Sequence, residues 1–451
     1  MTDQLSPPNS PEKSQDPPLV TQEPKSPESI FQATSEKPSL KGSPIRILHA
    51  SDWHLGRTLN RIRRRHEEQA LFLDWLIEVI NEAQIDVLLV AGDIFDSATP
   101  PVASQELYYD FLVKAQKTPL KDLVITAGNH DSAAFLMAPA KLLKYFNVHV
   151  VADPETLEEE ILVLNDQDKQ PYLVVAAAPF LKDRFLRIAQ EGETIQDKDR
   201  ALVQGLIAHY AAIAELALAK QMEAGGQIPI VGLGHLFARG GQIAEGDGVR
   251  DLYAGSLCQI PAEALPKAFD YLALGHLHRP QKVGRETIRY SGSPLMMSFA
   301  ENEAKSLAIV TLGGGQVKIE LLPIPVFQEL KRLKGTKLEL IEALEKLKKA
   351  DSQAWLELVH TGEEFLSNPR GLFEEVLKGS RMELIAIIDE RIEREIFGQA
   401  QPVKSLAEMS VTEVFERLLD RQGVKEEERP ELLASYQEIV LTLAESGQSL
   451  D

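Results

Sequence analysis

The sequence lacks several features that would point to other kinds of protein. It has one cysteine in 451 residues, Cys258, so no internal disulfide can form. It contains no Gly-Lys dipeptide, which excludes the phosphate-binding loop of P-loop ATPases. No apolar run reaches the ~20 residues of a membrane span, and the first residues lack the pattern of a signal peptide. These absences predict a cytoplasmic protein that binds no membrane and hydrolyses no ATP by itself.

Basic residues are also in the minority. The chain has 48 Lys and Arg against 68 Asp and Glu, a formal net charge of −20. A domain that binds nucleic acid is typically basic. If the substrate is nucleic acid, bound cations and a local basic patch must therefore neutralise its phosphates. The length predicts two or three domains, and a hydrophobic content of 44% is enough for a packed core.

Changes of pattern divide the chain into four segments. Residues 1–43 are rich in Pro, Ser, Glu and Gln, and we expect them to be disordered because they can bury little apolar area. Residues 44–324 alternate strands with helices and end in short strands, which predicts an α/β fold of the αββα type, two sheets flanked by helices. Residues 325–400 predict a small α/β capping domain, and residues 401–451 a helical hairpin too short to bury its apolar stripe alone. The helices expected in the large segment cover residues 65–83, 102–115 and 201–224.

Five short motifs with histidine, aspartate or asparagine each follow an apolar, strand-like run. The runs cover residues 45–50, 87–91, 123–127, 230–233 and 271–274. The motifs are Asp52-Trp53-His54, Gly92-Asp93, Gly128-Asn129-His130-Asp131, Gly234-His235 and Gly275-His276-Leu277-His278. Because an α/β sheet gathers its active site at the carboxyl ends of its strands, we expect the motifs to converge. Oxygen and imidazole ligands without thiolate suit a pair of Mn²⁺, Fe²⁺ or Zn²⁺ ions that cut a phosphate ester.

Each motif also has a purely structural interpretation when it is taken alone. Gly92-Asp93 could be a turn that caps a helix, and His235 could be an ordinary histidine. His276 and His278 are more specific, because alternate residues of an extended segment point to the same side. The common order and placement of all five motifs favour the metal site. The histidines outside the motifs are predicted to be structural or exposed; they are His49, in the first strand, and His66, His149, His209 and His360.

In this order the motifs resemble those of the calcineurin-like metallophosphoesterase superfamily. Further strings are similar to its bacterial DNA nuclease subunits, over about residues 45–450. These strings are residues 49–56, 91–96, 275–281 and 290–294, with Ser298-Phe299. The resemblance implies a two-sheet sandwich with two metal ions, most often Mn²⁺. The implied ligands of one ion are Asp52, His54, Asp93 and His278, and those of the other are the bridging Asp93, Asn129, His235 and His276.

The resemblance also implies roles for residues beside the ligands. His130 would be no ligand but the acid or transition-state stabiliser of the reaction. Asp96, three residues after Asp93, is predicted to set the tautomer and pKa of His130. A turn or helix-capping role is the alternative for Asp96, and Asp131 is the alternative partner of His130.

Arginines that follow the first motif are the predicted DNA contacts. They are Arg57, Arg61, Arg63, Arg64 and Arg65, with Arg279 and Ser293 as weaker candidates. Such cations would contact phosphates without reading sequence, although a charge run can also be a merely solvated face. The resemblance implies a partner, a coiled-coil ATPase of the SbcC type, and we expect the C-terminal hairpin to dock on it. It also implies a homodimer within a heterotetramer; residues 59–62 and 107–113 could supply apolar contacts.

The function implied by the resemblance is that of a metal-dependent phosphodiesterase in DNA repair, recombination and replication. With its ATPase it would act as an ATP-dependent 3′→5′ double-strand exonuclease and as a single-strand or hairpin endonuclease. A small-molecule phosphoesterase, such as a cyclic-nucleotide phosphodiesterase, shares the motifs, but the long segment after Ile324 argues against it. A non-enzymatic scaffold of the same fold is the second alternative, and the complete ligand set argues against that.

Overall fold

The structure is a computed structural model of the chain. It describes residues 44–59, 63–187, 193–242, 259–364 and 366–390, with residues 415, 419, 429, 432, 433 and 436. The tail expected over residues 1–43 lies outside these residues, as does most of the expected hairpin. The six described residues of the C-terminal segment are helical, and the rings of Phe415 and Tyr436 stack with centroids 3.9 Å apart. The docking role of that segment stays a prediction.

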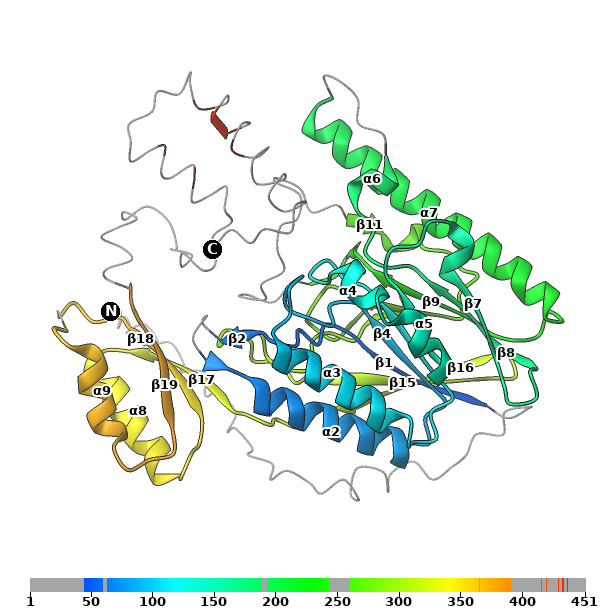
Figure 1. Cartoon of the computed structure of the whole chain (residues 1–451). Coiled ribbons are helices and arrows are strands. Elements are labelled where there is room, and N and C mark those ends of the chain that lie inside the picture. Colours follow the sequence, from blue (N-terminus) through cyan, green and yellow to red (C-terminus); the bar gives the residue numbers. More distant parts are fainter. Residues whose placement is uncertain are drawn as a thin grey trace, which may run out of the picture. The chain divides into compact units, whose positions relative to one another are not determined.

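The structure has two six-stranded sheets, and the first apolar run of the chain forms a central strand of the first sheet (Figure 1). Its strands, in spatial order, are β16 (Gln316–Pro323), β15 (Ser306–Gly313), β1 (Ile45–Ala50), β4 (Val87–Ala91), β5 (Asp122–Thr126) and β6 (Val148–Val151). β1, β4, β5 and β6 are parallel, whereas β15 pairs antiparallel with β1. The bounds predicted for β1 and β4 are confirmed, because strands buried on both faces read as continuous apolar runs.

The second sheet packs face to face on the first. Its strands, in spatial order, are β13 (Gln281–Val283), β14 (Arg285–Tyr290), β12 (Tyr271–Gly275), β9 (Ile230–His235), β8 (Pro171–Ala177) and β7 (Ile161–Asn165). Ile47, Val87 and Val124 of the first sheet share one buried core with Val175 and Val231 of the second. The predicted α/β sandwich of two sheets is therefore confirmed.

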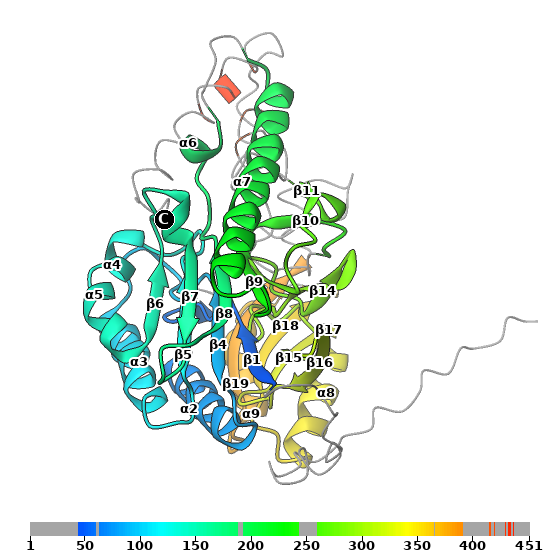
Figure 2. The same cartoon turned by 90° about the vertical axis from the view of Figure 1, so that its right-hand side faces the viewer.

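Helices cover the outer faces of the sandwich. α2 (His66–Glu82) and α3 (Val102–Ala115) pack together on one flank, and α7 (Ile195–Glu223) contacts β7, β8 and β9 on the other (Figure 2). α7 begins six residues earlier than predicted, because Thr194 and Asp197 form a capping box. By length and composition α7 could also cross a membrane, a test that core helices pass as well. Its buried stripe packs on the second sheet: Leu202, Leu206, Tyr210, Ile213 and Ala217.

A small parallel sheet follows the sandwich in the chain. Its elements are β17 (Leu330–Gly335), α8 (Lys337–Lys349), β18 (Trp355–His360), α9 (Pro369–Leu377) and β19 (Glu383–Asp389). The strand order β17-β18-β19 is sequential and parallel, so the unit has the order βαβαβ. β17 was not predicted from the sequence. Lys331, Arg332 and Lys334 interrupt the alternation of apolar and polar residues that marks a strand.

Candidate metal centre

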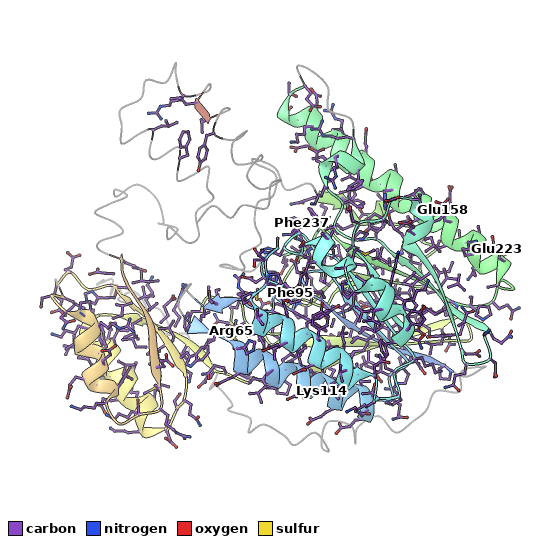
Figure 3. All side chains as sticks on the ribbon, in the orientation of Figure 1. Arg65, Phe95, Lys114, Glu158, Glu223 and Phe237 are labelled. Atoms are coloured by element: carbon purple, nitrogen blue, oxygen red, sulfur yellow. The ribbon has the colours of Figure 1, made fainter. Side chains whose placement is uncertain are left out.

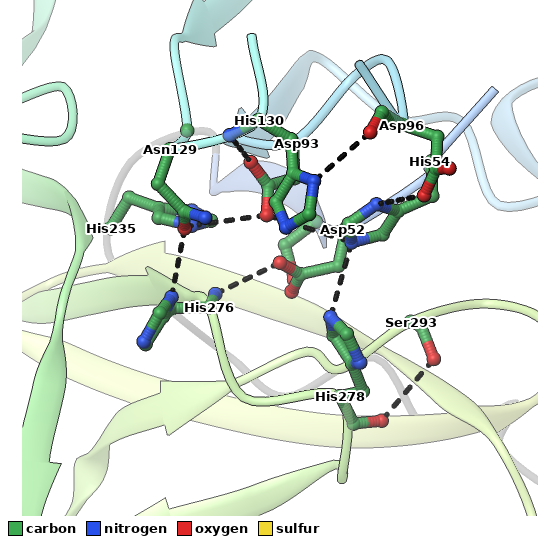
Figure 4. A network of polar contacts seen from close by, with 12 residues as sticks. Asp52, His54, Asp93, Asp96, Asn129, His130, His235, His276, His278 and Ser293 are labelled. Carbon is green, nitrogen blue, oxygen red and sulfur yellow. Dashed lines mark hydrogen bonds and ion pairs between the residues drawn. The ribbon is translucent and has the colours of Figure 1, made fainter. Parts of the chain in front are cut away.

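The five motifs meet where parallel strands of both sheets end (Figure 4). β1, β4 and β5 deliver three of them from the first sheet, and β9 and β12 deliver two from the second. The loops after β1 and β4 run side by side, since the backbone N–H of Asp52 donates to the Gly92 carbonyl and that of His54 donates to the Asp93 carbonyl, both at 3.0 Å. The sheet therefore brings together motifs that are far apart in the chain.

One group of donors surrounds the side chain of His54. Asp52, His54, Asp93 and His278 are buried, and one ligand atom of each lies within 4.8 Å of the others. The Nε2 atoms of His54 and His278 are 3.1 Å apart, and His54 Nε2 is 3.5 Å from Asp93 Oδ2. Two imidazole nitrogens and two carboxylates thus face one point, which suits a divalent cation.

A second group of donors shares the Asp93 carboxylate. Asp93 Oδ2 is 3.3 Å from His235 Nε2. Asn129 Oδ1 is 3.0 Å from His235 Nε2 and 3.0 Å from His276 Nδ1. Asp93 therefore contacts both groups of donors.

Two of the imidazoles are held in a tautomer suited to metal binding. Nδ1 of His54 is 3.2 Å from Asp96 Oδ1, and Nδ1 of His235 is 3.0 Å from the Ala91 carbonyl. Because a carboxylate and a carbonyl only accept hydrogen bonds, both Nδ1 atoms donate. The lone pair of the neutral ring is then on Nε2, which faces the cluster. Metal-ligating histidines are commonly fixed in this way.

Burial is the largest influence on the pKa values of the centre. It raises the pKa of Asp52 to about 6 and lowers the pKa values of His54 and His276 to about 3. Burial also opposes charge on Asp93 and His235, but their mutual contact overrides it. The pKa of His235 rises to about 9, and that of Asp93 falls well below its usual value. Divalent cations fit this site, because they would neutralise the buried carboxylates and displace the proton of His235.

The backbone of the centre is strained. Asp52, His54, Asp93 and His276 have positive φ values of 53°, 45°, 51° and 100°, and they make up half of the eight such non-glycine residues in the described part of the chain. Backbone strain of this kind concentrates at functional sites. Gly92, with φ +82°, lies so close to His235 that a Cβ atom there would be 2.2 Å from Nδ1. The motifs in the sequence do not reveal this backbone strain. Their glycines indicate only that the loops can come close to one another.

The structure brings Asp96 and His130 together and adds contacts that the spacing did not predict. His130 Nδ1 is 3.0 Å from the backbone carbonyl of Asp96, and one ring nitrogen of His130 lies within 4.8 Å of a carboxylate oxygen of Asp96. That carboxylate also accepts from His54 Nδ1 at 3.2 Å and from Arg57 Nη1 at 3.1 Å. Asp96 thus orients both histidines, one through its main chain and one through its side chain. Spacing from Asp93 alone could not separate these two contacts.

Asp131 supports the loops of the centre. Its carboxylate accepts from the backbone N–H groups of Ile94, Phe95 and Gly128 at 3.1, 2.9 and 2.9 Å. Burial, with the charge of Asp93 nearby, raises the pKa of Asp131 to about 7. Asp131 therefore joins the loops after β4 and β5, and its alternative role as partner of the His130 ring stays a prediction.

The structure assigns different positions to the predicted DNA contacts. Arg57 is paired with Asp96, and Arg63–Arg64 form β3, which pairs with β2 (Thr58–Leu59). Arg61 lies outside the described residues. Arg65, at the start of α2 (Figure 3), is only 3% exposed and pairs with Glu68.

Two of the predicted contacts are therefore wrong as surface contacts. Arg65 pairs with Glu68 and also donates to the Met296 carbonyl, so its guanidinium is engaged inside the protein. Ser293 is 1% exposed, and its hydroxyl donates to the Leu295 carbonyl at 2.9 Å. Both residues contact the loop between β14 and β15. Arg279, the remaining candidate, pairs with Glu303.

A two-sheet α/β sandwich with buried His and Asp donors at its strand ends defines a metallophosphoesterase. Residues 45–280 match the family described as calcineurin-like phosphoesterase. Residues 326–423 match the family described as type 5 capsule protein repressor C-terminal domain. The chain is 34% identical over 405 residues to the SbcD subunit of the SbcCD nuclease of Escherichia coli (strain K12), which covers 89% of this chain and 99% of that protein. The chain therefore belongs to the SbcD family of nuclease subunits and is a hydrolase.

Two further comparisons gave matches to this chain. The SbcD subunit of the SbcCD nuclease of Bacillus subtilis (strain 168) is 34% identical over 278 residues, which cover 60% of this chain and 67% of that protein. A dimetal phosphatase from Danio rerio is 12% identical, with a TM-score of 0.35, over 62% of this chain and 99% of that structure.

Proposed function

We propose that this nuclease cuts DNA phosphodiesters at the centre described above. With an SbcC-type ATPase it would act as an ATP-dependent 3′→5′ exonuclease on double-stranded ends and as an endonuclease on single strands and hairpins. The observation that carries the proposal is the Asp93 carboxylate, which contacts both groups of buried donors. A shared carboxylate is what a two-cation phosphodiesterase needs. We place the protein in the cytoplasm, on the nucleoid, in DNA repair, recombination and replication.

The ligands follow from the two groups. One cation would be held by Asp52, His54, Asp93 and His278, and the other by Asp93, Asn129, His235 and His276. Mn²⁺ is the proposed metal, because these oxygen and imidazole donors suit it. When bound, the two cations supply positive charge at the scissile phosphate and lower the pKa of water.

His130 would move the proton in the reaction. Its Nδ1–H donates to the carbonyl of Asp96, so Nε2 is the nitrogen that exchanges a proton. The rings of His130 and His54 have centroids 4.8 Å apart, which places the imidazole beside the proposed ligands. A protonated His130 would deliver its proton to the leaving 3′ oxygen or stabilise the charge that develops there.

DNA would reach this centre along the arginines that follow the first motif. Arg57 is held at its edge by Asp96, and Arg61, Arg63 and Arg64 follow in the chain. Contacts of these guanidinium groups with phosphates would offset, locally, the net charge of −20. They would position a duplex without reading its sequence.

The proposal is tested by a nuclease assay with an end-labelled linear duplex and a hairpin. Mn²⁺ or EDTA is added, with and without the ATPase partner and ATP. We expect Mn²⁺-dependent shortening from the 3′ end and opening of the hairpin, both stimulated by the partner, and no cleavage in EDTA. If DNA stays intact while bis-p-nitrophenyl phosphate is hydrolysed, the protein is a small-molecule phosphoesterase instead.

The C-terminal segment is the proposed docking element for the ATPase. Leu432 is an apolar side chain there that is 41% exposed, as expected of a helix that binds in a groove. Deleting residues 405–451 should abolish binding of the partner while metal-dependent cleavage by the isolated subunit persists. Deleting residues 1–43, a segment of similar length, is the control and should leave binding unchanged. Pull-down with the ATPase measures partner binding by both deletion variants, and unchanged affinity after the first deletion would refute the assignment.

A homodimer within a heterotetramer is the proposed assembly.

A further inference from the structure

A buried ion pair lies in the loop region between β14 and β15, outside all five motifs. Lys305 and Glu301 are each 6% exposed, and Lys305 Nζ is 2.5 Å from Glu301 Oε2. Taking two charges out of water is unfavourable, and a buried pair often contributes less to stability than apolar residues would. The pair therefore calls for an explanation beyond packing.

The Lys305 ammonium points to the main chain of a proposed metal ligand. Besides Glu301, it donates to the carbonyl oxygen of His278 at 2.9 Å and to Ser293 Oγ at 3.0 Å. An ammonium has three N–H donors, so these three contacts use all of them. The His278 carbonyl also accepts from the backbone N–H of Ser293 at 3.1 Å. The His278 carbonyl is thus held by two residues of the same loop, Lys305 through its side chain and Ser293 through its backbone.

Glu301 fixes the lysine and the loop together. One of its carboxylate oxygens contacts Lys305, while the other accepts from the backbone N–H of Met297 at 2.8 Å. Because the carboxylate neutralises the ammonium, the pair adds no net charge near a site that would hold cations. A lone lysine at this position would repel them.

The same loop lies directly against the centre. Gly292 has φ +76°, and a Cβ atom on it would be 2.7 Å from both the His278 carbonyl oxygen and the Pro280 nitrogen. Ser51 Oγ donates to Asp52 Oδ2 at 2.6 Å and also lies 3.4 Å from the Gly292 carbonyl oxygen. The loop therefore reaches Asp52 through Ser51 and contacts the main chain of His278 directly, and these two ligands belong to the same donor group (Figure 4).

We infer that Lys305, held by Glu301, is a positioning residue for His278. By fixing the carbonyl of His278 it aims the imidazole at the donor group of Asp52, His54 and Asp93. The inference rests on the proposed metal centre and assigns the pair to one of its two cations. Groups that orient a metal ligand typically change metal affinity about 10–100-fold when they are removed.

The test measures Mn²⁺ binding by titration calorimetry on the full-length chain. Lys305→Met leaves Glu301 buried without its partner, so the double variant Lys305→Met with Glu301→Leu, which removes both charges, is the main probe. Ser293→Ala removes one contact of the ammonium and leaves the pair intact. Lys305→Arg keeps the charge, and Lys318→Met, which breaks the surface pair with Glu320, is the matched control.

We expect the double variant to bind one of the two Mn²⁺ ions about 10–100-fold more weakly and the other normally. Its lost cleavage should return as Mn²⁺ is raised, with KM for DNA unchanged; Ser293→Ala should show a smaller shift at the same site. Lys305→Arg should restore part of the affinity, and Lys318→Met should behave as the unsubstituted protein. Two unchanged Mn²⁺ affinities in a double variant with a lower unfolding temperature would overturn the inference and make the pair merely structural. Absence of Mn²⁺ binding by the unsubstituted protein would instead refute the metal centre.

Discussion

The Asp93→Asn variant is expected to lose DNA cleavage by about 10³-fold and to bind fewer than two Mn²⁺ ions. Removing one preorganised electrostatic group from an active site typically costs about 10²–10³ in rate, and Asp93 serves both donor groups. An asparagine keeps the size of the side chain but removes the negative charge that would bridge two cations. Metal content per chain and kcat on a linear duplex measure the two effects.

The control for this substitution is Asp74→Asn. Asp74 is an exposed carboxylate of α2 that pairs with Lys114 at the surface, where an ion pair contributes little. This variant should keep both cations and full activity. If Asp93→Asn retained two Mn²⁺ ions and near-normal cleavage, the shared carboxylate would not be the centre of the reaction.

The His130→Ala variant is expected to keep both cations and to lose about 10²–10⁴-fold in kcat, the usual contribution of a general acid. The His130 backbone N–H donates to Asp93 Oδ1 at 2.9 Å, and alanine preserves this bond, so the carboxylate stays in place. The ring Nδ1 is held by the Asp96 carbonyl. Metal content, measured beside kcat, separates a proton-transfer role from a ligand role.

His149→Ala is the matched control for the loss of an imidazole. His149 Nε2 is 2.7 Å from Asp122 Oδ1, at the start of β5, whereas the motif of that strand follows its other end. This variant should keep kcat, whatever happens to its stability. Loss of a cation from His130→Ala would show that His130 is a ligand and would end its assignment as the acid.

The sequence is most informative where chain geometry leaves few choices. A run such as Val87–Ala91, buried on both faces, has few alternatives to a central parallel strand, and the next residues must then lie at the end of the sheet. The position of the motifs at strand ends therefore predicts that they converge, whereas the assignment of Asp93 and His278 to one donor group comes from the family resemblance. Neither predicts the positive φ of Asp93, because that strain is set by contacts with distant loops.

Side-chain partners are much harder to predict from the sequence. Spacing assigns Asp96 to His130, and the Asp96 carbonyl does contact that ring, but spacing does not predict that the Asp96 carboxylate also contacts His54 and Arg57 from the loop after another strand. The sequence does not predict the buried position of Lys305, because a single lysine in a loop is ordinarily exposed to solvent. Arg65 belongs to a run of arginines, yet it is buried against Glu68. Each of these outcomes depends on tertiary contacts that local spacing does not encode.

The pairing of β1 with β15 has a consequence for how the protein is made. His49 lies opposite Ala308. The first strand, β1, can therefore pair with β15 only after about 260 further residues have been synthesised. At about 5–20 residues per second, that interval lasts roughly 13 to 50 seconds on the ribosome. During this time one edge of the nascent sheet stays open to other chains. We therefore expect the nuclease to emerge inactive and to depend on protection of that edge until its last strands have been translated.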